Sequence, residues 1–303
     1  MGIRSLLLTG LVFSLTANSA PGWAKDGPVV LEPIGAWTLD MADNNCRMIR
    51  AFGSEERKTL LLLEQWDPTE QLTWMVTGDA TKGYGKRRKA HYSFGSGGDE
   101  GDIDLIGMTF EGHGPAIGTH STIVAKQSRP EGEDRDFSIE PRGLPELDSG
   151  AAEGITYLDI GIRAPDDFRL NLGSMKAPMS AMNMCMANLV EHWGFDGEQQ
   201  RSVVQPPLAK NMKNVVSEIT RSYPSKALGR GAQANFHIRV SVGADGTVED
   251  CVLLNQTVAK DFDQTRDPCY VFTQKAEFAP ATDTNGQPVP SFYATRIVYR
   301  MGR

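Results

Sequence analysis

The residues of this chain that could carry out chemistry are few and widely separated. The segment "EGHGPAIGTH" places Glu111 near His113 and His120, and the two histidines lie seven positions apart. On a strand, an odd separation points two side chains to opposite faces, so only a loop would bring both histidines to one metal ion or substrate. No cysteine or third histidine lies nearby. We therefore predict no metal site.

Motifs for nucleotide and nucleophile chemistry are also incomplete. Gly78 and Gly83 have the spacing of a phosphate-binding loop, but Tyr84 stands where that loop needs a lysine. In "FGSGG", Ser96 is one place away from the serine position of a nucleophile elbow. These patterns predict a protein that is not an enzyme and binds no cofactor. A catalytic triad scattered along the sequence stays open as an alternative.

The first 24 residues have the pattern of a secretory signal peptide. Arg4 is followed by an apolar run from Leu6 to Ala17 and then by small residues. The run has about 12 residues, fewer than the roughly 20 that a membrane-spanning helix needs. We expect residues 1–24 to be removed and the mature protein to be soluble in the periplasm. An uncleaved membrane anchor is the alternative.

Charge divides the chain into two modules. Residues 25–204 have a net charge of −11, whereas residues 205–303 have a net charge of +3. A change of sign at one place suggests a module boundary. We therefore expect one domain over residues 25–200 and a second over residues 205–303. The acidic total disfavours general binding of nucleic acid.

The four cysteines predict two disulfide bonds. An even number of cysteines in an exported chain favours pairing, and four cysteines allow three pairings. A boundary near residue 200 leaves one pair in each module, which favours Cys46–Cys185 and Cys251–Cys269. The alternative is that some of these thiols stay free and buried.

The first module is predicted to be β-rich with a late helix, which makes the chain an α+β protein. "KTLLLLEQW" and "QLTWMVTGD" are strand-like runs around a turn at Asp67-Pro68, and further runs follow up to residue 173. Residues 82–101 and 127–154 are predicted loops. From Pro178 onward the apolar residues follow helical spacing. This stripe consists of Met182, Cys185, Met186, Leu189, Val190 and Trp193.

The second module is predicted to hold a small antiparallel sheet. In "QANFHIRVSV" apolar residues alternate with polar ones, which indicates a strand with one buried face and a solvated face that carries His237 and Arg239. Asp245-Gly246 turns the chain into a return strand, and Asp267-Pro268 begins a helix. Val248 and Cys251 are out of phase, so a β-bulge is needed if both face the helices.

The stretch "EFAPATDTNGQPVP" is predicted to connect this helix to the last strand, "VPSFYATRIVYR". Asn285-Gly286 tolerates the positive φ of a turn, and Pro288 and Pro290 favour an extended backbone. The order helix–strand–strand–helix–strand predicts a three-stranded antiparallel sheet covered by two helices on one side.

Four spaced elements of this module resemble the TonB carboxy-terminal domain family. They are Tyr223-Pro224, the V-x-x-D-G-x-V hairpin from Val242 to Val248, "FAPA" from Phe278, and "GQPV" from Gly286. The resemblance covers about 85 residues. It departs from the family pattern at Ala234, where glycine is usual, and in "NQTVAKDF" after the second strand.

The resemblance implies a protein-binding module in a transport-related context. Domains of this family engage an extended peptide of an outer-membrane transporter by strand addition to a sheet edge. The expected partner is therefore an outer-membrane transporter or another envelope protein. The candidate edge is the last strand, Phe292, Tyr293, Ala294, Thr295, Arg296, Ile297, Val298 and Tyr299.

Two alternatives remain open at the level of function. A periplasmic hydrolase could occupy residues 25–200, with the second module as a targeting domain. An anchored energy transducer would need a retained leader and a long spacer across the periplasm. Only Pro206-Pro207 separate the modules, which disfavours the transducer.

Overall fold

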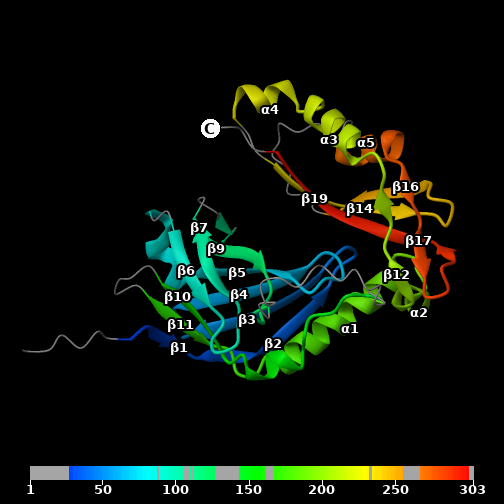
Figure 1. Cartoon of the computed structure of the whole chain (residues 1–303). Helices are drawn as coiled ribbons and strands as arrows, with labels where there is room; N and C mark the ends of the chain where they lie inside the picture. Colours follow the sequence, from blue (N-terminus) through cyan, green and yellow to red (C-terminus); the bar gives the residue numbers. More distant parts are fainter. Residues whose placement is uncertain are drawn as a thin grey trace, which may run out of the picture.

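The computed structural model describes most of the two predicted modules. The described residues are 27–86, 89–105, 109–110, 112–126, 143–161, 167–231, 234–254 and 267–299. The expected signal peptide, Glu111 and most of the predicted loop 127–154 lie outside them. In Figure 1, the sheets of the first module lie below and the smaller sheet of the second module lies above. The helices of the second module cover the side of its sheet that faces away from the first module.

The first module contains two sheets, in which most neighbouring strands are antiparallel. The larger sheet has the strand order β2-β3-β4-β5-β9-β8. Its strands are β2 (Pro33–Met41), β3 (Cys46–Gly53), β4 (Lys58–Gln65), β5 (Leu72–Gly78), β8 (Thr109–Phe110) and β9 (Gly114–Ser121). The second sheet has the order β1-β11-β10-β6-β7. Its strands are β1 (Val29–Leu31), β6 (Lys89–Ser93), β7 (Glu100–Asp104), β10 (Tyr157–Gly161) and β11 (Phe168–Asn171).

The prediction of a loop over residues 82–101 was wrong in part. A short 3₁₀ helix, η1 (Asp79–Lys86), is followed by β6, which pairs with both β7 and β10. The side chains of β6 alternate between exposed Lys89 and His91 and buried Ala90 and Tyr92. The basic residues before this short alternation hid the strand in the sequence.

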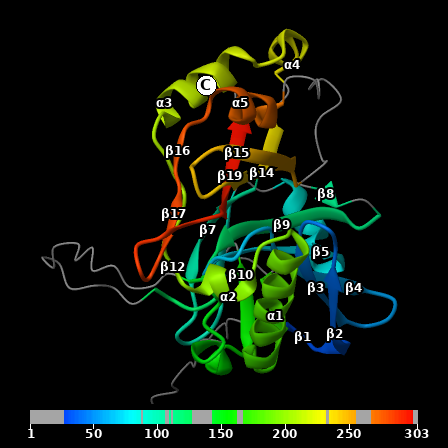
Figure 2. The ribbon, with the colours of Figure 1, turned by 90° about the vertical axis from the view of Figure 1, so that its right-hand side faces the viewer.

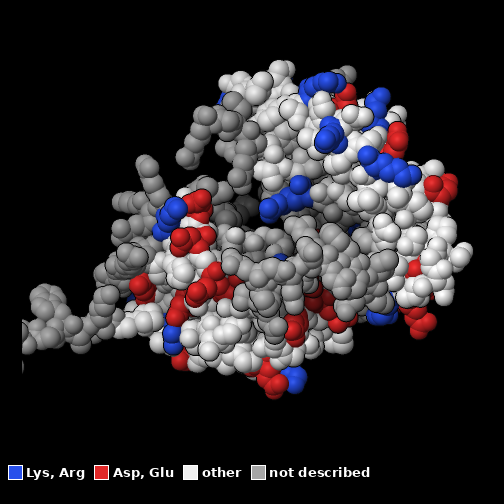
Figure 3. Space-filling model, in the orientation of Figure 1, with Lys and Arg blue, Asp and Glu red and all other residues white. Residues whose placement is uncertain are grey.

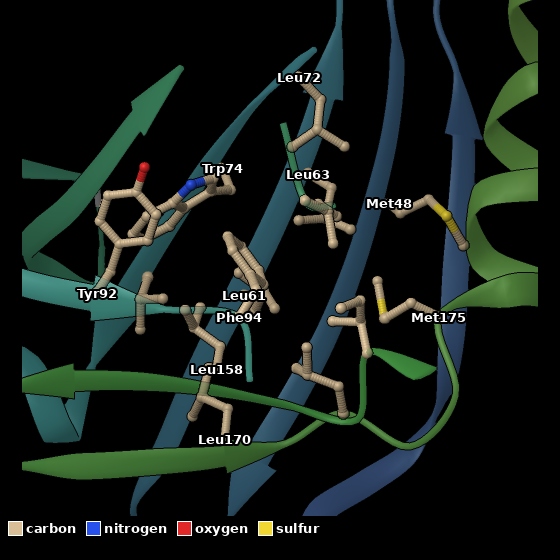
Figure 4. Packing of buried hydrophobic residues seen from close by; sticks show 14 of the residues in the cluster. Met48, Leu61, Leu63, Leu72, Trp74, Tyr92, Phe94, Leu158, Leu170 and Met175 are labelled. Atoms are coloured by element: carbon tan, nitrogen blue, oxygen red, sulfur yellow. The ribbon is translucent and has the colours of Figure 1, made fainter. Parts of the chain in front are cut away.

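One hydrophobic core lies between the two sheets (Figure 4). Leu61, Leu63 and Trp74 of the larger sheet face Leu158 and the aromatic residues of the second sheet. The Trp74 ring packs edge-on against Tyr92, with centroids 5.0 Å apart. Alternate residues of each strand point inward, because side chains on a strand alternate between its faces.

The predicted late helix is α1 (Lys176–His192). Its apolar stripe is buried, as the spacing indicated, and Trp193 directly follows its last residue. Cys185 forms a disulfide bond with Cys46 at the start of β3. This confirms the pairing expected within the first module and ties the helix to the larger sheet.

The second module contains the predicted three-stranded antiparallel sheet in the order β15-β14-β19. The strands are β14 (Ala234–Val242), β15 (Val248–Leu253) and β19 (Ser291–Tyr299). One side of the sheet packs against α3 (Met212–Arg221) and α5 (Pro268–Lys275), which together bury a separate core. Tyr223-Pro224 separates α3 from α4 (Ser225–Gly229), because a proline disfavours a helical conformation in the residue before it.

The predicted β-bulge and the second disulfide bond are both present. Val240 pairs with Cys251 and Val242 pairs with Val248, with a register shift between the two pairs. The bulge puts both β15 side chains on the helix side of the sheet. Cys251 therefore reaches Cys269 on α5, with which it is disulfide-bonded.

The stretch from residue 277 to residue 290 is more ordered than a connector. It forms β16 (Phe278–Ala279), β17 (Ala281–Asp283) and β18 (Pro288–Val289). β17 and β18 form a hairpin, whose turn contains Gly286 at a φ of 72°. β17 also pairs with β12 (Val203–Gln205), and β16 pairs with β13 (Leu208–Ala209). Both partner strands precede α3 in the chain. Together with α2 (Gly197–Arg201), these short strands form the junction of the two modules seen in Figure 2.

Candidate functional site at the junction of the two modules

The outer edge of β19 is the candidate binding edge. Within the described residues, β19 pairs with β14 alone and forms one border of its sheet. The other border is β15. Figure 1 shows β19 crossing the molecule between the helices of the second module and the sheets of the first.

The ladder register decides which backbone groups of β19 face outward. The Leu254 N–H donates to the His237 carbonyl at 2.8 Å, so His237 directs its backbone groups toward β15. The N–H and C=O groups of successive residues point to opposite edges of a strand. Those of Ile238 therefore point toward β19, where Ile238 pairs with Thr295. The N–H and C=O groups of Ala294 and Arg296 consequently point away from β14.

The side chains of β19 divide between the two sides of the sheet. Tyr293, Ile297 and Tyr299 pack into the core beneath the helices, and the Tyr299 hydroxyl donates to the Ile219 carbonyl of α3 at 3.2 Å. The opposite side, which we call the junction face, looks toward the first module. Its members are His237, Arg239 and Ser241 of β14 and Phe292, Ala294, Arg296 and Val298 of β19.

The junction face is covered by the first module at several points, which corrects the expectation that it is solvated. The His237 ring stacks on Trp66 of the β4–β5 turn, with centroids 5.4 Å apart. The Phe292 ring lies 5.5 Å from both Trp193 and Phe195. An alternating strand pattern shows that one face is polar, but it does not show whether another module covers that face.

Hydrogen bonds fix the same junction beside β19. Gln200 of α2 is buried, and its side-chain amide donates to the Pro290 carbonyl at 2.9 Å. The hydroxyl of Ser291 donates to the Gln200 side-chain oxygen at 2.7 Å. These bonds hold the beginning of β19 against the end of the first module.

Arg239 is the most unusual side chain at the junction. Only 7% of the residue is exposed, and its guanidinium lies 4.1 Å from the centroid of the Trp193 ring. No described residue accepts a hydrogen bond from its buried Nε or Nη1 atom. Burial lowers the pKa of Arg239 to about 10, and the charge of Asp250 opposes this shift. The group remains cationic at neutral pH.

Two histidines, His237 of the second module and His120 of the first, lie close enough at the junction for their charges to interact. Burial, with smaller contributions from the charges of Arg296 and His120, lowers the pKa of His237 to about 4. The pKa of His120 is also lowered, first by burial and then by the charge of Arg296, although the residue as a whole is exposed. Both imidazoles are therefore neutral at pH 7, beside two permanent cations.

A polar groove of about 480 Å³ opens next to His120. Asp99, Glu100 and Lys126 are among its lining residues. Figure 3 shows a hollow between the two modules, with Lys or Arg side chains at its border. The sequence had no signal for this groove, because its lining comes from segments far apart in the chain.

The structure does not bring the predicted histidine pair together. His113 lies in the turn before β9, where its ring lies 5.6 Å from that of Phe110, whereas His120 lies near the other end of β9. His120 instead contacts the Thr73 hydroxyl at 3.3 Å. Within the part of the chain that the structure describes, no three histidine, cysteine or acidic residues gather as metal ligands.

The comparisons with known proteins identify the second module. Residues 220–301 match the family described as Gram-negative bacterial TonB protein C-terminal. This part of the chain is a TonB C-terminal domain. Neither curated proteins nor solved structures gave a match to the chain.

The TonB C-terminal domain contains β14, β15, α5 and β19, and thus both the candidate edge and the whole junction face. TonB C-terminal domains are protein-interaction modules of transport systems, and they typically engage outer-membrane proteins in the periplasm. Among the helices of the described residues, none combines the length and the apolar character that crossing a bilayer requires.

Proposed function

We propose that this protein binds an extended peptide segment of an envelope protein by adding it as a fourth strand to the free edge of β19. Ala294 and Arg296 direct their backbone groups away from β14, and this observation carries the proposal. Unpaired backbone groups at a sheet edge form a template for a partner strand. An outer-membrane transporter is the partner class that the domain family suggests.

The protein acts without catalysis in this proposal. His120 is held by Thr73, and the Asp99 carboxylate accepts a hydrogen bond from Tyr92 at 2.7 Å. A hydrolase would need a nucleophile, a base and an orienting group within hydrogen-bonding reach of one another. The hydrogen bonds of His120 and Asp99 instead fit structural roles in the first module.

We further propose that the protein works in the periplasm after export. The leader pattern of residues 1–24 and the two disulfide bonds support an oxidising compartment. The intact mass of the protein purified from the periplasm tests this. A chain that begins at Lys25 is expected, and a retained leader would favour the anchored transducer.

A single proline substitution in β19 tests strand addition. Ala294→Pro removes an outward N–H, whereas the adjacent Tyr293 and Thr295 keep their bonds to β14. Ala294→Ser is the matched control, because it keeps the N–H at the same position. Both variants should fold, as judged by circular dichroism and the thermal unfolding midpoint.

The readout is capture of envelope proteins from periplasmic and outer-membrane extracts, followed by mass spectrometry and a binding titration with the captured segment. Ala294→Pro should lower the affinity at least tenfold, and Ala294→Ser should stay within threefold of the unmodified protein. Equal binding by a folded Ala294→Pro variant would refute addition at this edge.

A further inference from the structure

Arg239 is a buried cation whose Nε and Nη1 donors have no acceptor among the described residues, and this observation suggests a ligand. A guanidinium that is nine-tenths buried is ordinarily hydrogen-bonded, because an unpaired buried charge is costly. The Trp193 ring stabilises the cation but accepts no hydrogen bond from its edge. Asp250 contributes only through its charge. An acceptor is therefore missing from this place in the described structure.

We propose that Arg239 and Arg296 form a carboxylate-binding site, and that its occupant is a Glu or Asp side chain of the peptide added to β19. This inference rests on the proposed strand addition and specifies its partner. The two modules build the site together, because Trp193 of the first module supports Arg239 of the second.

The register of the sheet places the site next to the free edge. Arg239 pairs with Ala294 across the ladder, and His237 pairs with Arg296. Ala294 has the smallest side chain of the junction face on β19, so little side-chain volume separates Arg239 from the edge. A peptide residue opposite Ala294 places its side chain on this same face, because paired residues of adjacent strands share a side.

The charges at the junction select an anion. Arg239 and Arg296 are permanent cations, and the influence of Arg296 reaches both His120 and His237. Because both imidazoles are neutral at pH 7, they can take part in hydrogen bonds without adding charge. A carboxylate among these groups would gain charge-assisted hydrogen bonds, whereas a lysine side chain would be repelled.

Two tryptophan rings border the site and should favour a bound carboxylate side chain over small anions from the buffer. Trp66 and Trp193 of the first module stand over His237 and Arg239, respectively. A low-polarity surrounding strengthens a hydrogen bond between a carboxylate and a guanidinium relative to water. We therefore expect the preference for a carboxylate to survive at physiological ionic strength.

Two synthetic peptides test the inference on the full disulfide-bonded protein. Both carry the acetylated, amidated sequence Thr-Val-Thr-X-Val-Thr-Val, with Glu or Gln at X. Isothermal titration at pH 7 should show at least tenfold tighter binding of the Glu peptide, since hydrogen bonds to a charged carboxylate are stronger than those to a neutral amide. Arg296→Gln and Arg239→Met should each reduce this ratio below threefold without weakening the Gln peptide.

Arg221→Gln is the matched control, because it removes a cation from an exposed position on α3. It should keep the tenfold preference. Arg296 is exposed, so its substitution leaves the fold intact even if Arg239→Met proves unstable. As a second readout, the pKa of His237 measured by NMR should rise with the Glu peptide and stay unchanged with the Gln peptide.

The outcomes separate the two proposals. Equal binding of both peptides to the unmodified protein would leave strand addition standing and overturn the carboxylate site. A preference that persists in Arg296→Gln and Arg239→Met would place the carboxylate elsewhere and also overturn it. If neither peptide binds at millimolar concentration, strand addition at this edge fails and the inference fails with it.

Discussion

At the residue scale, Asp67 in the turn between β4 and β5 carries an energetic cost at neutral pH. Burial raises the pKa of Asp67 to about 6, from a usual value of 3.8. Because the folded pKa is raised, its favourable contribution is complete below pH 3.8 and is lost as the pH rises through about 6. Above pH 6 the folded protein holds a desolvated carboxylate.

We expect Asp67→Asn to stabilise the protein above pH 6. The shift corresponds to a gain of about 1–3 kcal/mol in the free energy of unfolding at pH 8, and to almost none at pH 4. Urea titrations at both pH values measure it. Glu70→Gln, in an exposed position of the same turn, is the control. A loss of stability at pH 8 would contradict the assignment.

His237 has the opposite pH dependence. Its pKa is lowered to about 4 by burial, by Arg296 and by His120. The stability that depends on a neutral His237 is complete above its unfolded pKa near 6.5 and is lost as the pH falls toward 4. Its titration affects the junction of the modules, because the ring stacks on Trp66.

At the element scale, the two disulfide bonds act on chain segments of very different length. Cys46–Cys185 joins residues 139 positions apart and links α1 to β3, whereas Cys251–Cys269 spans 18 positions between β15 and α5. A cross-link over a longer loop removes more conformational entropy from the unfolded chain. The first bond should therefore contribute more to stability.

Replacing each pair with alanine tests this order. The Cys46→Ala/Cys185→Ala variant should lose about 5 kcal/mol and the Cys251→Ala/Cys269→Ala variant about 3 kcal/mol. Thermal unfolding of both variants, with the oxidised protein as the reference, provides the comparison. A larger loss from the second pair would show that packing of α5 on β15, and not chain entropy, dominates.

At the scale of the whole molecule, aromatic contacts and the hydrogen bonds of Gln200 hold the modules together. The acidic and basic halves of the sequence are visible in Figure 3, where Asp and Glu predominate below and Lys and Arg above. Trp193 is central to the contact, because it touches Phe292 and Arg239 of the second module and also packs against the first core.

We predict that Trp193→Ala loosens this junction. The loss of ring contacts should lower the unfolding free energy by about 2 kcal/mol and increase cleavage by trypsin at Arg201 or Lys210, between the modules. Met184→Ala changes an exposed residue of α1, the helix that Trp193 follows, and should have neither effect. Unchanged cleavage in Trp193→Ala would mean that the modules are held mainly by the Gln200 contacts.

The module boundary near residue 200 favoured both disulfide pairings among the three possible sets. The sequence by itself also determined the α+β class, the late helix and the three-stranded sheet. These features depend on alternation, helical spacing and turn residues, which act over a few positions of the chain. The Val248–Cys251 phase difference even predicted the bulge. In contrast, β6 was missed because five residues with basic neighbours are too short for a clear alternating pattern.

Only the tertiary structure decided what covers the polar face of β14. Local alternation is identical for a strand face in water and for one packed against another module, so His237 and Arg239 were predicted to be solvated. Contacts with Trp66 and Trp193 join residues more than 40 positions apart, and Arg239 is buried there with no acceptor among the described residues for its Nε and Nη1 atoms. Burial of this kind depends on how the modules pack, which no short sequence pattern records.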